Sequence, residues 1–166
     1  LAEAQYKQAE DYLEKSLDIY TQLGDQQGLS NSYNELGVLA EEQALYQKAL
    51  KHYQDALTIR INLSNQMLQA ESMNNIGFMY YMLLNHEHAL VYWQQAEQLF
   101  QRIQFPIGII HVQQNLAQIE LSKGNWRNAF HLFNNTLKDA SALNSVEETI
   151  VAKSYLAKLG FLQGGF

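Results

Sequence analysis

The chain has 166 residues, no cysteine, one proline and a formal net charge of −6, which together exclude several classes of protein. Without cysteine there is no disulfide framework and no zinc site built on thiolates. An excess of acidic residues does not supply the positive surface that binding to a nucleic-acid backbone requires. The longest nearly unbroken apolar run, residues 76–84, is about half as long as a membrane span. We therefore expect a helical, cytoplasmic chain that binds neither nucleic acid directly nor a membrane.

The sequence repeats with a period of 40 residues, without insertions. Alanine recurs in one series, and an aliphatic residue followed by a small one recurs in another. These series are Ala9, Ala49, Ala89 and Ala129, and the pairs Leu36-Gly37, Ile76-Gly77, Leu116-Ala117 and Leu156-Ala157. A fixed period of this length is typical of repeat architectures, in which each unit buries its apolar face against its neighbours.

Each repeat unit is predicted to form two helices. Over residues 46–63, apolar side chains recur at i, i+3, i+4 and i+7, which is one stripe of a helix. Residues suited to helix capping stand at the junctions: Asp25, Asn65, Asn85, Asn125, and Ser145 with Glu148 as a capping box. We expect complete helix pairs over 26–63, 66–103 and 106–143, a second helix of an incomplete repeat over 6–23, and a first helix over 146–162.

Small residues in the repeat indicate where the helices cross. Gly37, Ala49 and Ala89 are predicted to lie at close crossings that leave no room for a larger side chain. The segments YNELGVL and MNNIGFM, followed by the pattern YQKALKHYQDAL, resemble the tetratricopeptide repeat (TPR). The resemblance implies an all-α fold, a right-handed superhelix (α-solenoid) of antiparallel helix pairs. The 40-residue form is similar to the arrays of bacterial MalT-like and quorum-type regulators and of Pins and kinesin light chain.

The resemblance also implies a partner-binding groove lined by the first helix of each unit. Carried over position by position, it gives the candidate residues Asn34, Glu41, Glu42, Glu71, Asn74, Phe78, Tyr81, Met82, Gln114 and Gln118. Asn34, Asn74 and Gln114 form an uncharged column, which is either a ladder for an extended peptide backbone or a solvated polar face. The aromatic residues and methionine form an apolar floor, and the glutamates favour a partner with basic beside hydrophobic residues.

The sequence contains no convincing catalytic or metal-binding pattern. His86 and His88 are the densest histidine pair, and residues two apart on a helix point to different sides. No glycine-rich nucleotide-binding motif is present. We predict no catalytic residue, no metal site and no cofactor.

The chain starts and stops inside a repeat, so we expect it to be a piece of a longer protein. Uncovered apolar faces are expected at both ends, formed by Tyr12, Leu13, Leu17 and Ile19 and by Tyr155, Leu159, Phe161 and Leu162. The favoured function is a non-catalytic protein- or peptide-binding module of a signalling or regulatory protein. The alternatives are a small-ligand or signal-peptide sensor that controls an attached output domain, and an element that self-associates head to tail through its ends.

Overall fold

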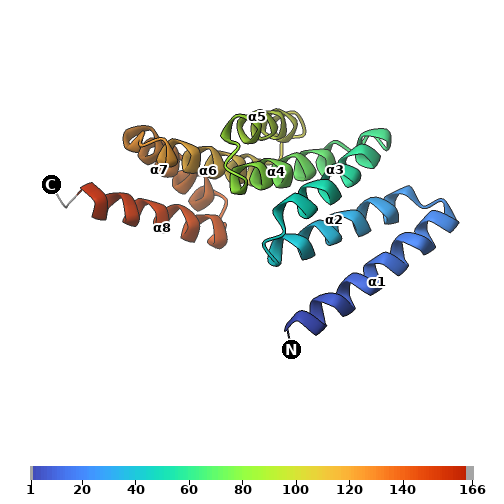
Figure 1. Ribbon diagram of the computed structural model, residues 1–166. Helices are drawn as coiled ribbons and strands as arrows, with labels where there is room; N and C mark the ends of the chain where they lie inside the picture. Colours follow the sequence, from blue (N-terminus) through green and yellow to red (C-terminus); the bar gives the residue numbers. More distant parts are fainter. Residues whose placement is uncertain (1, 164–166) are drawn as a thin grey trace. The chain divides into compact units, whose positions relative to one another are not determined.

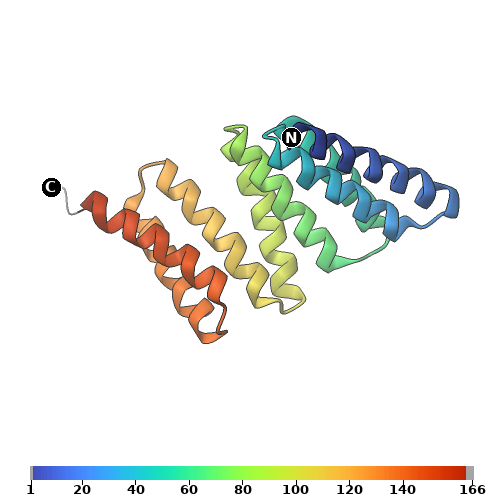
Figure 2. The ribbon, with the colours of Figure 1, turned by 90° about the horizontal axis from the view of Figure 1, so that it is seen from below.

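The structure, a computed structural model, describes residues 2–163, and side chains are described for residues 3–160. Within that range it contains eight helices and no strand, so the predicted all-α fold of paired helices is confirmed (Figures 1 and 2). No helix among these residues is long and apolar enough to cross a membrane. The helices are α1 (Ala2–Leu23), α2 (Gln26–Glu42), α3 (Tyr46–Asn62), α4 (Gln66–Met82), α5 (His86–Arg102), α6 (Pro106–Ser122), α7 (Trp126–Ala142) and α8 (Val146–Gln163).

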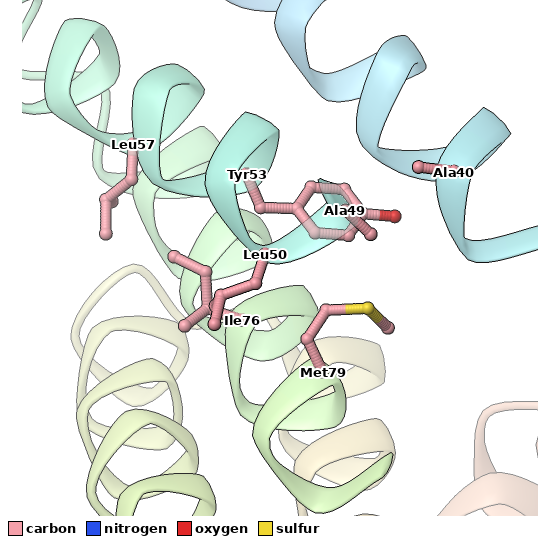
Figure 3. Packing of buried hydrophobic residues seen from close by; sticks show 7 residues of the cluster. All are labelled: Ala40, Ala49, Leu50, Tyr53, Leu57, Ile76 and Met79. Atoms are coloured by element: carbon pink, nitrogen blue, oxygen red, sulfur yellow. The ribbon is translucent and has the colours of Figure 1, made fainter. Parts of the chain in front are cut away.

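The chain divides into two compact units, one running to Leu99 and one beginning at Phe100. In the first unit, α2, α3 and α4 share a core of buried side chains, namely Ala40, Ala49, Leu50, Tyr53, Leu57, Ile76 and Met79 (Figure 3). In the second unit, α6, α7 and α8 enclose a smaller core formed by Ala117, Ala129, Phe133 and Leu159. Each core contains side chains from first helices and from second helices of the repeats, as expected when a helix hairpin buries its apolar face against the next hairpin.

The helices are separated by turns of one repeated backbone geometry. Every twentieth residue from Gly24 to Asn144 has a positive φ, and α2 to α7 are all 17 residues long. At the first turn Gly24 N–H donates to Thr21 O and Asp25 N–H donates to Tyr20 O, which is the Schellman pattern. The residues with positive φ are Gly24, Ala44, Ser64, Leu84, Gln104, Gly124 and Asn144. Most are not glycine, so the fold holds several residues in a backbone conformation that L-residues disfavour.

A ring packed on a glycine sets the distance between the two helices of a repeat. A methyl group added at Gly37 would lie 2.6 Å from the Tyr53 ring, and one added at Gly77 would lie 2.6 Å from the indole of Trp93. Both rings are buried, and the Trp93 indole N–H donates to Asn74 O at 3.0 Å. The predicted close crossings are confirmed, because the repeated alanines are also fully buried, at Ala49, Ala89 and Ala129.

The predicted helix caps are confirmed at three of five junctions. In these, the side chain accepts a hydrogen bond from the backbone N–H three residues later, at Asp25, Asn65 and Asn85. The prediction for Asn125 is wrong, because its amide donates instead to the Glu120 carboxylate at 3.0 Å. The predicted Ser145–Glu148 contact exists, but the serine hydroxyl donates to the carboxylate instead of capping the backbone.

The predicted apolar end face of α8 is partly wrong. Leu159 is fully buried, and the Tyr155 ring stacks on Phe133 with 4.6 Å between ring centroids, so both residues belong to the core of the second unit. Phe161 and Leu162 lie outside the described side chains. The exposed large apolar side chains of α8 lie near its beginning, at Val146 and Ile150.

The glycine crossing predicts opposite effects for the same substitution at two helical sites. Gly77→Ala should lower the free energy of unfolding by about 1–3 kcal/mol, because the Trp93 ring must move out of a filled site. Gly160→Ala has no atom within 4 Å of the added methyl group and should raise stability by up to about 1 kcal/mol through helix propensity. Urea melts of both variants measure the difference. Equal melts would show that the ring is free to move away from Gly77.

Candidate partner-binding surface

The first helices of the first unit carry most of the candidate partner-binding residues. Helices α2 and α4 contain four glutamates and no lysine or arginine, so their field is negative. Gln114 and Gln118 lie on α6 in the second unit and are described separately below. We call the following residues of α2 and α4 the unit-1 surface: Glu41, Glu42, Glu71, Asn74, Phe78, Tyr81 and Met82.

Aromatic stacking fixes the apolar part of the unit-1 surface. The Tyr81 ring stacks on His86 with centroids 5.4 Å apart and on Phe78 at 6.4 Å, and it lies tilted against Trp93 at 5.9 Å. Phe78 also packs against the core of the first unit. Met82, like Phe78 and Tyr81, is half-buried. The structure therefore holds these apolar side chains in place while leaving part of each at the surface.

The three glutamates of the unit-1 surface differ in how firmly they are held. The Tyr53 hydroxyl donates to the Glu41 carboxylate at 2.7 Å. Burial raises the pKa of Tyr53, and the hydrogen bond to Glu41 raises it further, so this phenol stays a donor. Glu42 is exposed and Glu71 is half-buried. One carboxylate is thus fixed to the core, while Glu42 faces solvent.

Asn34 supports a buried arginine. Arg60 is 3% exposed, and its guanidinium Nη1 donates to Asn34 Oδ1 at 3.3 Å, to Leu68 O at 3.2 Å and to Ser72 Oγ at 2.7 Å. Burial lowers the pKa of Arg60, and the nearby charge of Glu71 opposes that shift. Because a buried charge must be hydrogen-bonded, the Asn34 side-chain oxygen has a structural role.

Gln114 does not form part of an accessible amide column. Its side chain is 4% exposed, and its amide donates to Glu148 O at 3.0 Å. The Gln118 amide donates to Asn115 Oδ1 at 3.4 Å along the same helix. The prediction of a ladder is therefore wrong for Gln114. Its side chain is buried against α8, and its amide already donates a hydrogen bond to the backbone of that helix.

Glu148 lies at the centre of a small polar network in the second unit. It is 4% exposed, and its carboxylate contacts His111 Nε2 at 2.5 Å and the Ser145 hydroxyl. The carboxylate separates serine from histidine, whereas nucleophilic catalysis needs the histidine beside the hydroxyl. No group of three or more His, Asp or Glu side chains within residues 3–160 is placed to hold a metal ion. The network joins His111 of α6 to the first turn of α8.

The roles of two residues that contact sequence-predicted candidates, Arg60 beside Asn34 and His86 beside Tyr81, were not identified from the sequence. Arg60 stands in a repeat column whose other members are Tyr20, Phe100 and Ala140, and this lone charge in an apolar column was the available signal. The sequence predicts that His86 lies on a helix, but it does not indicate that the His86 ring stacks on Tyr81. His86 and His88 contact different tyrosines, Tyr81 and Tyr80, in agreement with the prediction that they point to different sides.

His52 is a half-buried ionisable residue of the first unit whose two ring nitrogens are covered. Both ring nitrogens are buried without a hydrogen-bond partner, and the ring lies 6.4 Å from Tyr33. Burial lowers the pKa of His52. Lys48 and Lys51 act in the same direction, while Asp55 and Glu10 oppose them. The fold therefore favours the neutral imidazole.

Paired helices with small-residue crossings and a fixed period define a helical repeat protein. The chain belongs to the tetratricopeptide repeat family: models described as tetratricopeptide repeat match residues 1–62 and 69–103, together more than half of the sequence. A repeat of this family is a protein-interaction module. No curated protein is significantly similar to the chain in sequence.

Solved structures share the fold at low sequence identity. BtubC (BKLC) from P. vanneervenii superposes with a TM-score of 0.74 at 18% identity, over 99% of this chain and 77% of that protein. A Rap protein complexed with competence and sporulation factor gives a TM-score of 0.78 at 19% identity, over 96% and 49%. The apo form of RapI gives 0.61 at 19% identity, over 96% and 63%. The chain thus spans about half of the first Rap protein.

Removing the Asn34 amide should destabilise the fold. Asn34→Ala takes an acceptor from the buried Arg60 guanidinium and should lower the free energy of unfolding by about 1–3 kcal/mol. Asn31→Ala, on an exposed face of the same helix, should change it by less than about 0.5 kcal/mol. Denaturant melts at neutral pH measure both. If the two variants are equally stable, the Asn34 side chain has no structural role and is available to a partner.

His52 should make the fold less stable in mild acid. The unfolded state binds more protons than the folded state below pH about 6.5, because the folded pKa is lowered, so stability falls as pH decreases. His52→Phe should raise the free energy of unfolding by about 1 kcal/mol at pH 7, by removing unpartnered polar atoms, and the gain should widen towards pH 5. His131→Phe, at an exposed site, should show no widening. A constant gap for His52→Phe would argue against a folded state that favours the neutral imidazole of His52.

Proposed function

We propose that the chain is a non-catalytic module whose unit-1 surface binds an extended protein segment carrying a hydrophobic residue beside a basic one. The observation that carries this proposal is the composition of α2 and α4, which combine stacked, half-buried aromatics with four glutamates and no basic residue. A pre-positioned aromatic anchor loses little entropy on binding, and a negative surround raises the association rate of a basic partner.

The similarity in fold to a Rap protein solved with competence and sporulation factor supports a binding role for this array. We further propose a regulatory setting, in which partner binding to the repeats controls activity elsewhere in a longer protein. This chain covers 49% of the Rap protein and 63% of RapI, so in both of these proteins further residues accompany the matching helices. Asn74 contributes contacts to the partner at the same surface, while Asn34 supports the first unit by accepting a hydrogen bond from the buried Arg60.

Substitution on the unit-1 surface should separate anchors from peripheral contacts. Peptides selected on the intact chain from a displayed random library should contain aromatic or aliphatic residues beside Lys or Arg. For the best such peptide, Tyr81→Ala should weaken binding by about 2 kcal/mol or more, and Asn74→Ala by about 0.5–1.5 kcal/mol. Phe130→Ala, at an exposed aromatic of α7, should leave binding unchanged. Titration calorimetry measures all three.

The negative charge of the unit-1 surface should act mainly on the rate at which a basic peptide associates with the chain. Glu42→Gln should slow association and reduce its dependence on salt, whereas Asp139→Asn, an exposed acid of α7, should have no effect. Unchanged binding in both Tyr81→Ala and Glu42→Gln would place the partner site elsewhere on the chain. A selected peptide set without basic residues would contradict the electrostatic part of the proposal.

A further inference from the structure

In each unit, hydrogen bonds join one first helix to the first turn of the next first helix. In the second unit, the Gln114 amide of α6 donates to Glu148 O of α8 at 3.0 Å. In the first unit, the Arg60 guanidinium of α3 donates to Leu68 O of α4 at 3.2 Å and to Asn34 Oδ1 of α2 at 3.3 Å. We call each of these an inter-repeat link. The link is direct in the second unit and passes through an arginine in the first.

The two inter-repeat links occupy the same positions of the 40-residue repeat. Gln114 follows Asn34 by two periods, and Glu148 follows Leu68 by two periods. In both units the carbonyl acceptor therefore lies 34 residues after the amide side chain. This recurrence indicates that the link belongs to the design of the repeat and is not an isolated contact.

Three columns of the repeat differ together between the two links. Those that hold an asparagine, an arginine and a serine in the first unit hold a glutamine and two alanines in the second. They are Asn34, Arg60 and Ser72 against Gln114, Ala140 and Ala152. The Ser72 hydroxyl is a further acceptor for the arginine, at 2.7 Å. Because asparagine is one methylene shorter than glutamine, the arginine completes a link that glutamine makes alone.

The burial of Arg60 is not explained by stability alone. Arg60 is 3% exposed, and its Nε is buried without a hydrogen-bond partner among residues 3–160. Replacing a buried charged group by apolar side chains is often neutral or stabilising, because the cost of desolvation offsets the attraction. In the second unit the same column holds the fully buried Ala140. The column therefore packs without a charge, and what Arg60 adds is a directional link between α2 and α4.

We infer that Arg60 is a positioning residue for the unit-1 surface, because it fixes the separation of the two helices that carry this surface. The inference rests on the proposed function. Glu41 and Glu42 stand on α2 and the stacked aromatics on α4, so a partner that contacts both needs the two helices at a set distance. The shared apolar core holds these helices by non-directional packing, whereas the hydrogen bonds of Arg60 weaken steeply when either helix shifts.

The positioning role and the charge of Arg60 predict opposite changes in binding. The charge of Arg60 interacts with that of Glu71. An uncharged residue in its place leaves the unit-1 surface more negative, which by itself would favour a basic peptide. Loss of position weakens binding instead, because the peptide must then order the two helices. The direction of the change therefore separates the two effects.

Spin labels measure the spacing of α2 and α4 without any ligand. Cysteines placed at Ala44 and Leu84 carry the labels, since both residues are exposed, follow α2 and α4 at equivalent turns, and have no native cysteine to compete with them. The distribution of label distances should be narrow in the otherwise unaltered chain and should broaden in Arg60→Met. Arg127→Met, at an exposed arginine of α7, should leave it unchanged. Circular dichroism should show the same helical content in all three.

A compensating substitution tests the link itself. Asn34→Gln in the Arg60→Met background should narrow the distribution again, because the longer amide can donate to Leu68 O as Gln114 does to its own acceptor. Ser72→Ala keeps the arginine and removes one acceptor, so it should broaden the distribution to a smaller extent. It provides the same test if Arg60→Met does not fold. An unchanged distribution in the arginine and serine variants, or a broadening that Asn34→Gln does not reverse, would overturn the link as the device that sets the spacing.

The peptide selected on the intact chain supplies the second measurement. Arg60→Met should weaken its binding by about tenfold, and Asn34→Gln in the same background should restore it. Stronger binding by Arg60→Met, or unchanged binding while Tyr81→Ala still weakens it, would overturn the positioning role and leave the proposed function standing. If neither Tyr81→Ala nor Arg60→Met affects the peptide, the proposed function fails and the positioning role fails with it, while the label distances still decide whether Arg60 sets the spacing.

Discussion

The close crossing between the two helices of each repeat is the constraint on which the rest of the structure depends. In the first two complete repeats a tyrosine or tryptophan ring lies directly on a glycine of the facing helix, so the helix axes approach more closely than side chains of ordinary size permit. This contact has a second effect besides burying apolar surface. It aligns the two helices in one register, and that register places every other column of the repeat, including the core residues seen in Figure 3.

The same crossing links the core to the candidate binding surface. Trp93 is buried on Gly77, donates to the backbone of Asn74 and lies against Tyr81, so one side chain joins the crossing to two residues of the unit-1 surface. Tyr53 similarly packs on Gly37 and donates to Glu41. The rings that hold the helices together therefore also position surface groups, and this rigidity favours binding because fewer side chains must be ordered by the partner.

Buried polar groups decide which of the amide side chains are available. Arg60 replaces an aromatic or small residue in its column, and its guanidinium needs acceptors that the apolar neighbours do not provide. Asn34 and Ser72 supply them. In the second unit, Gln114 is used in the same way by the backbone of Glu148. Positions that are equivalent in the repeat therefore have different roles, because one buried charge or amide changes what its neighbours must do.

The sequence by itself determined the periodic part of this protein. The columns of Ala49, Ala89 and Ala129 and of Gly37 and Gly77 predicted the helix pairs and their crossings, because packing of this kind leaves the same small residues at the same spacing. Only the tertiary structure decided what breaks the period. No residue type marks Leu84 or Gln104 as left-handed turn positions, since the helices on either side impose that conformation. Likewise, the burial of Gln114, the partners of Arg60 and the exposure of Ile150 depend on which side chains face them across the helix pairs. Local pattern does not encode these contacts between distant residues.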